Sequence, residues 1–269
     1  MPLLIAVAVV LFIIFLYLFL VLPSLRRHPD EAKLKGLYIA HRGLHNKEQG
    51  IPENSMKAFG AAIEKGYAIE NDIHLTADGE IVVFHDDTLD RVCGVSGKVE
   101  EKTLRELKEL RLLGTDEQIP TLSECLELVD GRVPLLIEFK VVGGNTSALC
   151  EGASEILKDY KGLYFVQSFY PGVLRWYKKN RPDLCRGQLS TAFKGEQLHK
   201  RLLGCLLSNV VARPHFVSYE WKYPNKLSRK ITALFGATPV CWTLQSEEQL
   251  ESSKGYFETY IFENFIPKK

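Results

Sequence analysis

The sequence predicts an α/β fold built on a parallel sheet, because strand and helix signals alternate along most of the chain. Short apolar runs rich in β-branched and aromatic residues are followed by stretches in which apolar side chains recur at helical spacing, over roughly 230 residues. This number of strand–helix units suits a TIM (β/α)8 barrel that forms one domain. An open, doubly wound sheet has the same alternation, so periodicity does not exclude it.

Local signals place the elements in order. Asn54 or Ser55 can cap a helix at residues 55–65. The turn Ala77-Asp78-Gly79 joins two strands at residues 68–75 and 81–85. Pro182 follows the helix expected at residues 172–180, which a proline cannot continue. Further strands are expected at residues 37–40, 135–139, 163–168, 185–189, 215–219, 239–243 and 260–262, and further helices at residues 103–113, 122–129, 146–160 and 226–235.

The N-terminal segment is a candidate membrane span. Residues 3–22 form an unbroken apolar run, which as a helix would be about 30 Å long and match a bilayer core. We therefore expect a transmembrane anchor at residues 1–25, a charged linker at residues 26–35 and the barrel at residues 36–269. The alternatives are a buried core helix and a cleaved secretory signal. No Lys or Arg precedes the run and no cleavage motif of small residues follows it, which argues against the signal.

Charge around this segment predicts its orientation. Arg26, Arg27, Lys33 and Lys35 follow the run and no basic residue precedes it, so the positive-inside rule places the barrel in the cytoplasm as part of a single-pass membrane protein. The six cysteines contain no CxxC pair and are then expected to be reduced core thiols. An extracellular barrel would instead predict disulfides.

The composition is that of an enzyme-sized globular domain. Hydrophobic residues make up 46% of the chain and charged residues 25%, which is enough apolar material for a sizeable core. The 34 basic residues are balanced by 33 acidic ones. Because recognition of a phosphate backbone normally requires a basic excess, this balance argues against a nucleic-acid partner.

Chemically active side chains stand at or beside the ends of the expected strands. The motifs are His41-Arg42-Gly43, Pro52-Glu53-Asn54-Ser55, Glu70-x-Asp72, Leu75-Thr76-x-Asp78-Gly79, His85-Asp86 and Glu138-x-Lys140, followed by Gln167-Ser168-Phe169 and Trp242-Thr243. Their order and spacing closely resemble the glycerophosphodiester phosphodiesterase family from Gly36 to the C-terminus, and the resemblance implies the barrel rather than the open sheet. Asn71 and the last strand end, Glu263-Asn264, depart from the usual family pattern.

The resemblance also explains the long connection at residues 87–118 as a small insertion after the His85-Asp86 strand. Asn71 lies between Glu70 and Asp72 on a strand. Alternate residues of a strand point to opposite faces, so we expect Asn71 to affect packing rather than chemistry.

Three carboxylates are candidate metal ligands. Glu70 and Asp72 share one face of a strand, and Glu138 ends another apolar strand. A shell of carboxylate oxygens favours one hard divalent cation, Mg²⁺ or Ca²⁺, over Zn²⁺. The alternative of three surface acids conflicts with the apolar run before Glu138, which is expected to be buried.

His41 and His85 are the candidate acid and base, because two imidazoles titrating near neutrality can take a proton from a nucleophile and give one to a leaving oxygen. Arg42 and Lys140 are the candidate ligands of the phosphoryl oxygens, with ion pairing to the carboxylates as the alternative. Trp242 is a candidate wall for the glycerol or lipid moiety, with core packing as the alternative. The roles of Glu53, His45 and His74 stay open.

Three functions remain in view. The resemblance implies metal-dependent hydrolysis of a glycerophosphodiester to an alcohol and glycerol 3-phosphate, through attack by a glycerol hydroxyl and a cyclic phosphate. A lysophospholipase D or phospholipase acting on membrane lipid would keep this site and change the substrate. An inactive, membrane-tethered protein that binds a headgroup or serves as a scaffold would not need both His41 and His85.

Overall fold

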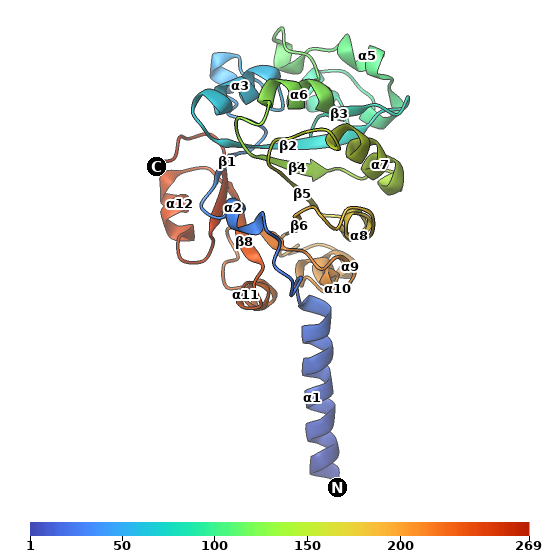
Figure 1. Cartoon of the computed structure of the whole chain (residues 1–269), viewed down its shortest axis with the longest axis vertical. Helices are drawn as coiled ribbons and strands as arrows, with labels where there is room; N and C mark the ends of the chain where they lie inside the picture. The colour runs from blue at the N-terminus through green and yellow to red at the C-terminus, as the bar shows by residue number, and fades with distance from the viewer. Residues whose placement is uncertain (269) are drawn as a thin grey trace.

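Eight parallel strands close into a barrel in the computed structural model, which describes residues 1–268 (Figure 1). The order around the sheet is β1-β9-β8-β7-β6-β5-β4-β2, and pairing of β1 with β2 closes it. The predicted TIM barrel is confirmed and the open sheet is excluded. The barrel strands are β1 (Tyr38–Ala40), β2 (Ala68–Leu75), β4 (Leu135–Phe139), β5 (Tyr164–Ser168), β6 (Arg186–Ser190), β7 (Phe216–Glu220), β8 (Thr238–Leu244) and β9 (Thr259–Phe262).

The interior of the barrel changes from apolar to polar along the strands. Leu136, Phe165 and Phe216 belong to a buried apolar cluster in its lower part. Two residues further along the same strands stand Glu138, Gln167 and Ser218, which are also buried. Since residues two apart on a strand share a face, the apolar layer supports a polar layer at the carboxyl ends.

Gly187 in β6 is required by this packing. A Cβ placed there would lie 2.0 Å from the ring of Phe216, so any side chain would collide with the ring that fills the barrel.

Helices cover the outside of the barrel, mostly where the sequence predicts them. The expected helix at residues 103–113 is shorter, Leu104–Lys108, because a capping box starts it at Thr103 but the chain turns away after Glu109. Five short helices without a clear apolar period were not predicted: α2 (Glu31–Leu34), α4 (Asp90–Cys93), α9, α10 and α12. The helices are α3 (Met56–Glu64), α5 (Leu104–Lys108), α6 (Leu122–Val129), α7 (Thr146–Leu157), α8 (Pro171–Asn180), α9 (Leu198–Gly204), α10 (Asn209–Ala212), α11 (Leu227–Leu234) and α12 (Glu247–Ser253).

The strand β3 (Ile81–Val83) lies outside the closed barrel. It pairs antiparallel with β2, and it is shorter than the expected strand at residues 81–85. The insertion after it, with α4 (Asp90–Cys93) and α5, has a small apolar core of its own that includes Phe84, Val92 and Leu107. The hairpin therefore brings His85 to the mouth of the barrel without adding a barrel strand.

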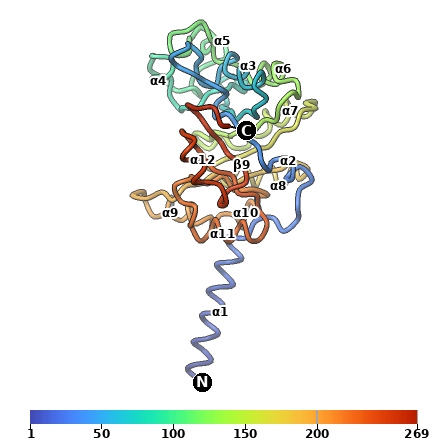
Figure 2. Tube along the Cα trace, turned by 90° about the vertical axis from the view of Figure 1, so that its left-hand side faces the viewer, coloured from blue at the N-terminus to red at the C-terminus, as the bar shows by residue number. Residues whose placement is uncertain are grey.

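The N-terminal helix α1 (Pro2–Val21) projects from the body, as both views show (Figures 1 and 2). It is long and apolar enough to cross a membrane, and little of it is buried. Residues 26–35, expected as a linker, contain a short helix α2 (Glu31–Leu34) that packs onto the barrel. Leu34 is fully buried there, and its carbonyl accepts a hydrogen bond of 2.7 Å from Thr259 Oγ1.

Candidate active site

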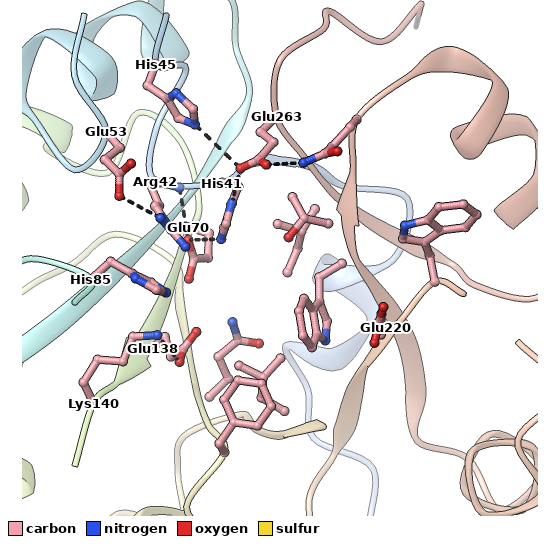
Figure 3. Close-up of a pocket in the computed structure, with 18 of the residues that line it drawn as sticks. His41, Arg42, His45, Glu53, Glu70, His85, Glu138, Lys140, Glu220 and Glu263 are labelled. Carbon is pink, nitrogen blue, oxygen red and sulfur yellow. Dashed lines mark hydrogen bonds and ion pairs between the residues drawn. The ribbon is translucent and has the colours of Figure 1, made fainter. Parts of the chain in front are cut away.

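A cleft opens at the carboxyl ends of the barrel strands, where active sites of this fold class are found. Figure 3 shows its labelled side chains, with most charged groups on one side and Glu220 across from them. Every site residue with a role predicted from the sequence lines this cleft except Asp72, which lies beneath it with its carboxylate against Lys140. The lining residues among the predicted set are His41, Arg42, Glu70, His85, Glu138, Lys140 and Trp242.

The three predicted metal ligands come together. Asp72 and Glu138 are register partners on the neighbouring strands β2 and β4. With Glu70 they offer oxygen atoms that all lie within 4.8 Å of one another, and all three residues are buried. Among the described residues, no hydrogen-bond donor reaches Oε1 of Glu70. A buried oxygen without a partner, in a set made only of carboxylates, fits a hard divalent cation.

The charges in this cluster are unevenly compensated. Burial, together with the carboxylates of Asp72 and Glu138, raises the pKa of Glu70 well above its usual range. Burial opposes ionisation of Asp72 too, but the charges of Lys140, His85 and Arg42 outweigh it and hold the pKa of Asp72 below its usual range. Lys140 Nζ lies 2.6 Å from Glu138 Oε1 and 3.0 Å from Asp72 Oδ1. The Lys140 ammonium thus contacts two of the three acids, but burial still raises the pKa of Glu138 as well as that of Glu70.

His41 is held by a residue from the other end of the chain. Its Nδ1 lies 2.6 Å from Oε2 of Glu263, which directly follows β9, and its Nε2 lies 4.0 Å from Glu70 Oε2. Burial lowers the pKa of His41, and the hydrogen bond to Glu263 opposes this effect. A neutral His41 that donates Nδ1–H to Glu263 keeps Nε2 free toward the carboxylates.

His85 is held in a similar way by its neighbour in sequence. Its Nδ1 lies 2.6 Å from Asp86 Oδ1, and Arg91 donates from Nε to Asp86 Oδ2 at 2.6 Å. Burial lowers the pKa of His85 to about 4. His74, whose role was open, is fully buried, with Nδ1 2.5 Å from Glu100 and Nε2 3.3 Å from the His85 carbonyl. It therefore supports the His85 segment from behind.

Arg42 connects the first loop to the acids. Its backbone N–H donates to Glu70 Oε2 at 3.1 Å, and its guanidinium donates to Glu53 Oε1 at 2.7 Å. Glu53 also accepts from Arg91, so it is an ion-pair partner of two arginines. The following Gly43 has φ +78°, and a Cβ there would lie 2.8 Å from Ala58. The tight turn that presents Arg42 thus requires glycine at this position.

The opposite side of the cleft contains its apolar lining residues, beside the charged Glu220 and Lys222. Phe169, Leu189, Trp221 and Trp242 line it. The Trp242 ring packs edge to face on Phe169, with ring centres 5.7 Å apart. Trp242 therefore lines the cleft and also packs against Phe169, so the wall and the packing considered for it from the sequence are both present.

Sequence reasoning assigned no role to three side chains that hold the candidate histidines: Glu263, Asp86 and Arg91. Glu263 ends an apolar strand, which is the signal that marked the other candidates, but it stood out only as a departure from the family pattern. His45, left open, lies with Nε2 3.7 Å from Glu263. Asn71 points away from the cleft, as expected, and donates to Cys125 Sγ of α6 at 3.4 Å.

Fold and site together define a barrel protein with a polar, carboxylate-rich centre of hydrolytic type. The sequence profile of the glycerophosphoryl diester phosphodiesterase family matches residues 41–253 of this chain. The chain belongs to this family, and it is a phosphoric diester hydrolase, as the motifs predicted.

Individual relatives agree with this assignment. A glycerophosphodiester phosphodiesterase of Caldanaerobacter subterraneus is 36% identical over 182 residues, which are 63% of this chain and 72% of that protein. A lysophospholipase D of Rattus norvegicus is 32% identical over 158 residues, 54% of this chain and 48% of that protein. An Oleispira antarctica phosphodiesterase, solved in complex with the product sn-glycerol-3-phosphate, superposes with a TM-score of 0.72 at 25% identity, covering 87% of this chain and 94% of that one.

Proposed function

We propose that the chain hydrolyses glycerophosphodiesters to an alcohol and glycerol 3-phosphate, with one divalent cation, Mg²⁺ or Ca²⁺, held by Glu70, Asp72 and Glu138. The observation that carries the proposal is the buried carboxylate trio beside two histidines, each oriented through Nδ1 by a carboxylate. A bound cation would neutralise negative charge on the phosphoryl group. The product named for the Oleispira antarctica structure is the one expected here.

His41 and His85 act in this proposal as the acid–base pair. One imidazole takes the proton of the substrate's glycerol hydroxyl as that oxygen bonds to phosphorus, and the other protonates the leaving alcohol oxygen as its bond to phosphorus breaks. The product of this step is a cyclic phosphate. Water then attacks phosphorus, loses a proton to one imidazole and opens the ring to glycerol 3-phosphate, while the other imidazole protonates the ring oxygen that departs.

Arg42 and Lys140 are proposed to bind the phosphoryl oxygens. Both have ion-pair partners, at 2.7 Å for Arg42 and 2.6 Å for Lys140, and both also line the cleft. These ion pairs hold the cations in position before substrate arrives, so little reorganisation is needed when charge develops on the phosphoryl group. Trp242 is proposed to contact the alcohol moiety from the apolar side.

A second candidate function is release of the headgroup from a membrane lysophospholipid, the lysophospholipase D reaction. The apolar side of the cleft favours it, because Phe169, Leu189 and Trp221 offer a surface for an acyl chain. The named activity of the Rattus norvegicus relative agrees with it.

We further propose that residues 1–25 span the membrane, residues 26–35 connect the span to the barrel, and the barrel lies in the cytoplasm. The apolar α1 and the basic residues that follow it support this topology. All six cysteines are free thiols.

The proposed activity is tested with purified full-length protein on glycerophosphocholine, glycerophosphoethanolamine and lysophosphatidylcholine, with Mg²⁺, Ca²⁺ or excess chelator. We expect turnover that requires an ion. Turnover of the lysolipid alone would favour the second candidate, and absence of turnover on all three would favour a silent binding protein. A cytoplasm-dependent reporter fused after Lys269 tests the topology, and a silent reporter would overturn it.

A further inference from the structure

The helix α11 has its apolar side toward solvent. It buries Ser228, Arg229 and Thr232, while Leu227 is 62% and Leu234 81% exposed. The buried Arg229 is satisfied by the carbonyls of Pro224 and Tyr256, at 2.7 and 2.9 Å. A surface helix of a protein surrounded by water normally has the opposite arrangement.

The neighbouring helices share this property. Six of the ten large apolar side chains that are exposed after residue 25, within the described part of the chain, belong to α9, α10 and α11 or to the residue that follows α11. Large apolar side chains exposed on neighbouring helices are typical of a binding surface. The six are Leu198, Leu202, Val211, Leu227, Leu234 and Phe235, and we call the surface that they form the α9–α11 face.

The charge of this region is strongly asymmetric. Residues 193–236 contain eight basic and two acidic residues, while the rest of the chain has 26 basic and 31 acidic ones. Exposed cations on the α9–α11 face include Lys194, Arg201 and Lys230. Apolar side chains mixed with Lys and Arg are typical of helices that lie on a membrane with anionic lipids.

The α9–α11 face lies next to the end of α1, and therefore close to the bilayer that α1 is proposed to span. In both views α9, α10 and α11 surround the point where α1 leaves the body (Figures 1 and 2). Val21 is fully buried, its carbonyl accepts a hydrogen bond of 2.8 Å from Asn209 Nδ2, and the Ser24 N–H donates to Pro214. A helix of 20 residues is about as long as a bilayer core is thick, so the bilayer surface falls at this joint.

We propose that the α9–α11 face docks on the surface of an anionic phospholipid bilayer, with its leucines in the interface and its lysines and arginines at the headgroups. The proposal rests on the proposed membrane span.

Docking would bring the apolar side of the cleft to the lipid. Phe193, in the loop before α9, has its ring centre 6.2 Å from that of Phe169, which in turn packs on Trp242. An aromatic path thus connects the docked face with the site where the alcohol moiety is proposed to bind.

The test uses the full chain, purified and reconstituted into vesicles of phosphatidylcholine and phosphatidylglycerol that carry nitroxide-labelled lipids. In a Cys93→Ser, Cys205→Ser background, a fluorophore is attached at Leu234→Cys or, as the control, at Val95→Cys. Val95 is also exposed but follows α4, far from α1 (Figure 2). We expect quenching at position 234 to exceed that at position 95 about threefold or more, because interfacial side chains lie about 5–10 Å inside the headgroup boundary.

Failure of the span and failure of docking are separated by floating the vesicles after an alkaline wash. Protein that does not float overturns the span. Floating protein with equal quenching at the two positions overturns the docking. Since the vesicles contain no other protein, this result would mean that the α9–α11 face is free in the membrane-anchored protein and available to a protein partner.

Charge reversal tests the role of the cations. We expect Lys226→Glu with Lys230→Glu to reduce the quenching at position 234, and the same reversal at Lys158 and Lys161, at the end of α7, to leave it unchanged. Equal quenching in all three proteins would overturn the part assigned to anionic headgroups.

Discussion

The two sides of the cleft are assembled on different principles. The side built from β1, β2, β4 and β9 is held by short contacts between charged groups, such as His41 with Glu263 and Lys140 with Glu138, both at 2.6 Å. The side built from β5 to β8 carries the apolar lining residues, with Phe169 against Trp242, next to the charged Glu220 and Lys222. Directional contacts fix the geometry of groups that react, whereas an apolar wall accepts alcohols of different shape. From this comparison we propose that one side carries the chemistry and the other the choice of substrate.

The largest effect is expected for the histidines of the charged side. His41→Ala and His85→Ala should each lower kcat by about two to four orders of magnitude, the usual scale for a lost proton-transfer group. Steady-state kinetics with circular dichroism as a folding check measures this. His28→Ala, on the far side of the barrel, is the matched control. Retention of more than about a tenth of the turnover in either variant would remove that residue from the acid–base pair.

Loss of a carboxylate from the trio should act mainly on ion binding. Glu70→Gln is expected to weaken Mg²⁺ or Ca²⁺ binding by about 100-fold or more. Mutating a residue that only orients a metal ligand already lowers metal affinity by about 10–100-fold, and Glu70 is proposed to be a ligand itself. Isothermal titration calorimetry measures the affinity, and Glu155→Gln on the surface of α7 is the control. Full activity of the unmodified protein in excess chelator would contradict the metal hypothesis.

Glu263 should act through His41. Glu263→Gln removes a charge that raises the pKa of His41, so this pKa should fall further below its usual value. The part of the pH–rate profile that requires neutral His41 should then extend to lower pH. We also expect kcat to fall by about 10–100-fold, the usual effect of removing a residue that orients a functional group. A profile that moves toward higher pH, or does not move, would show that Glu263 does not set the protonation of His41.

The smallest effect is expected on the apolar side. Trp242→Ala should raise KM for lysophosphatidylcholine about tenfold. An aromatic contact contributes about 0.5–1.5 kcal/mol to binding in addition to the burial of apolar surface, and the variant loses this contribution. kcat on glycerophosphocholine should change little, because the charged side is intact. A loss of kcat on both substrates, as large as that of the histidine variants, would erase the division between the two sides.

The candidate site was predictable because its signals are local. Glu70 and Asp72 lie within β2 and Glu138 near the end of β4, and residues two apart on a strand share a face whatever the rest of the fold. His41 and His85 were found from the same pattern. Glu263 was not, because its partner lies 222 residues away and only closure of the barrel brings the two together.

Sequence by itself determined the strand–helix alternation, the apolar N-terminal run and most of the candidate side chains at the mouth, because each follows from local periodicity or from neighbouring residues. Tertiary structure alone decided that β3 stays outside the barrel, that His74 supports His85, and that α11 turns Leu227 and Leu234 outward. The sequence predicts a helix at residues 226–235 but does not say which of its side chains are buried. Their exposure depends on which face the rest of the chain covers, and that is set by long-range packing.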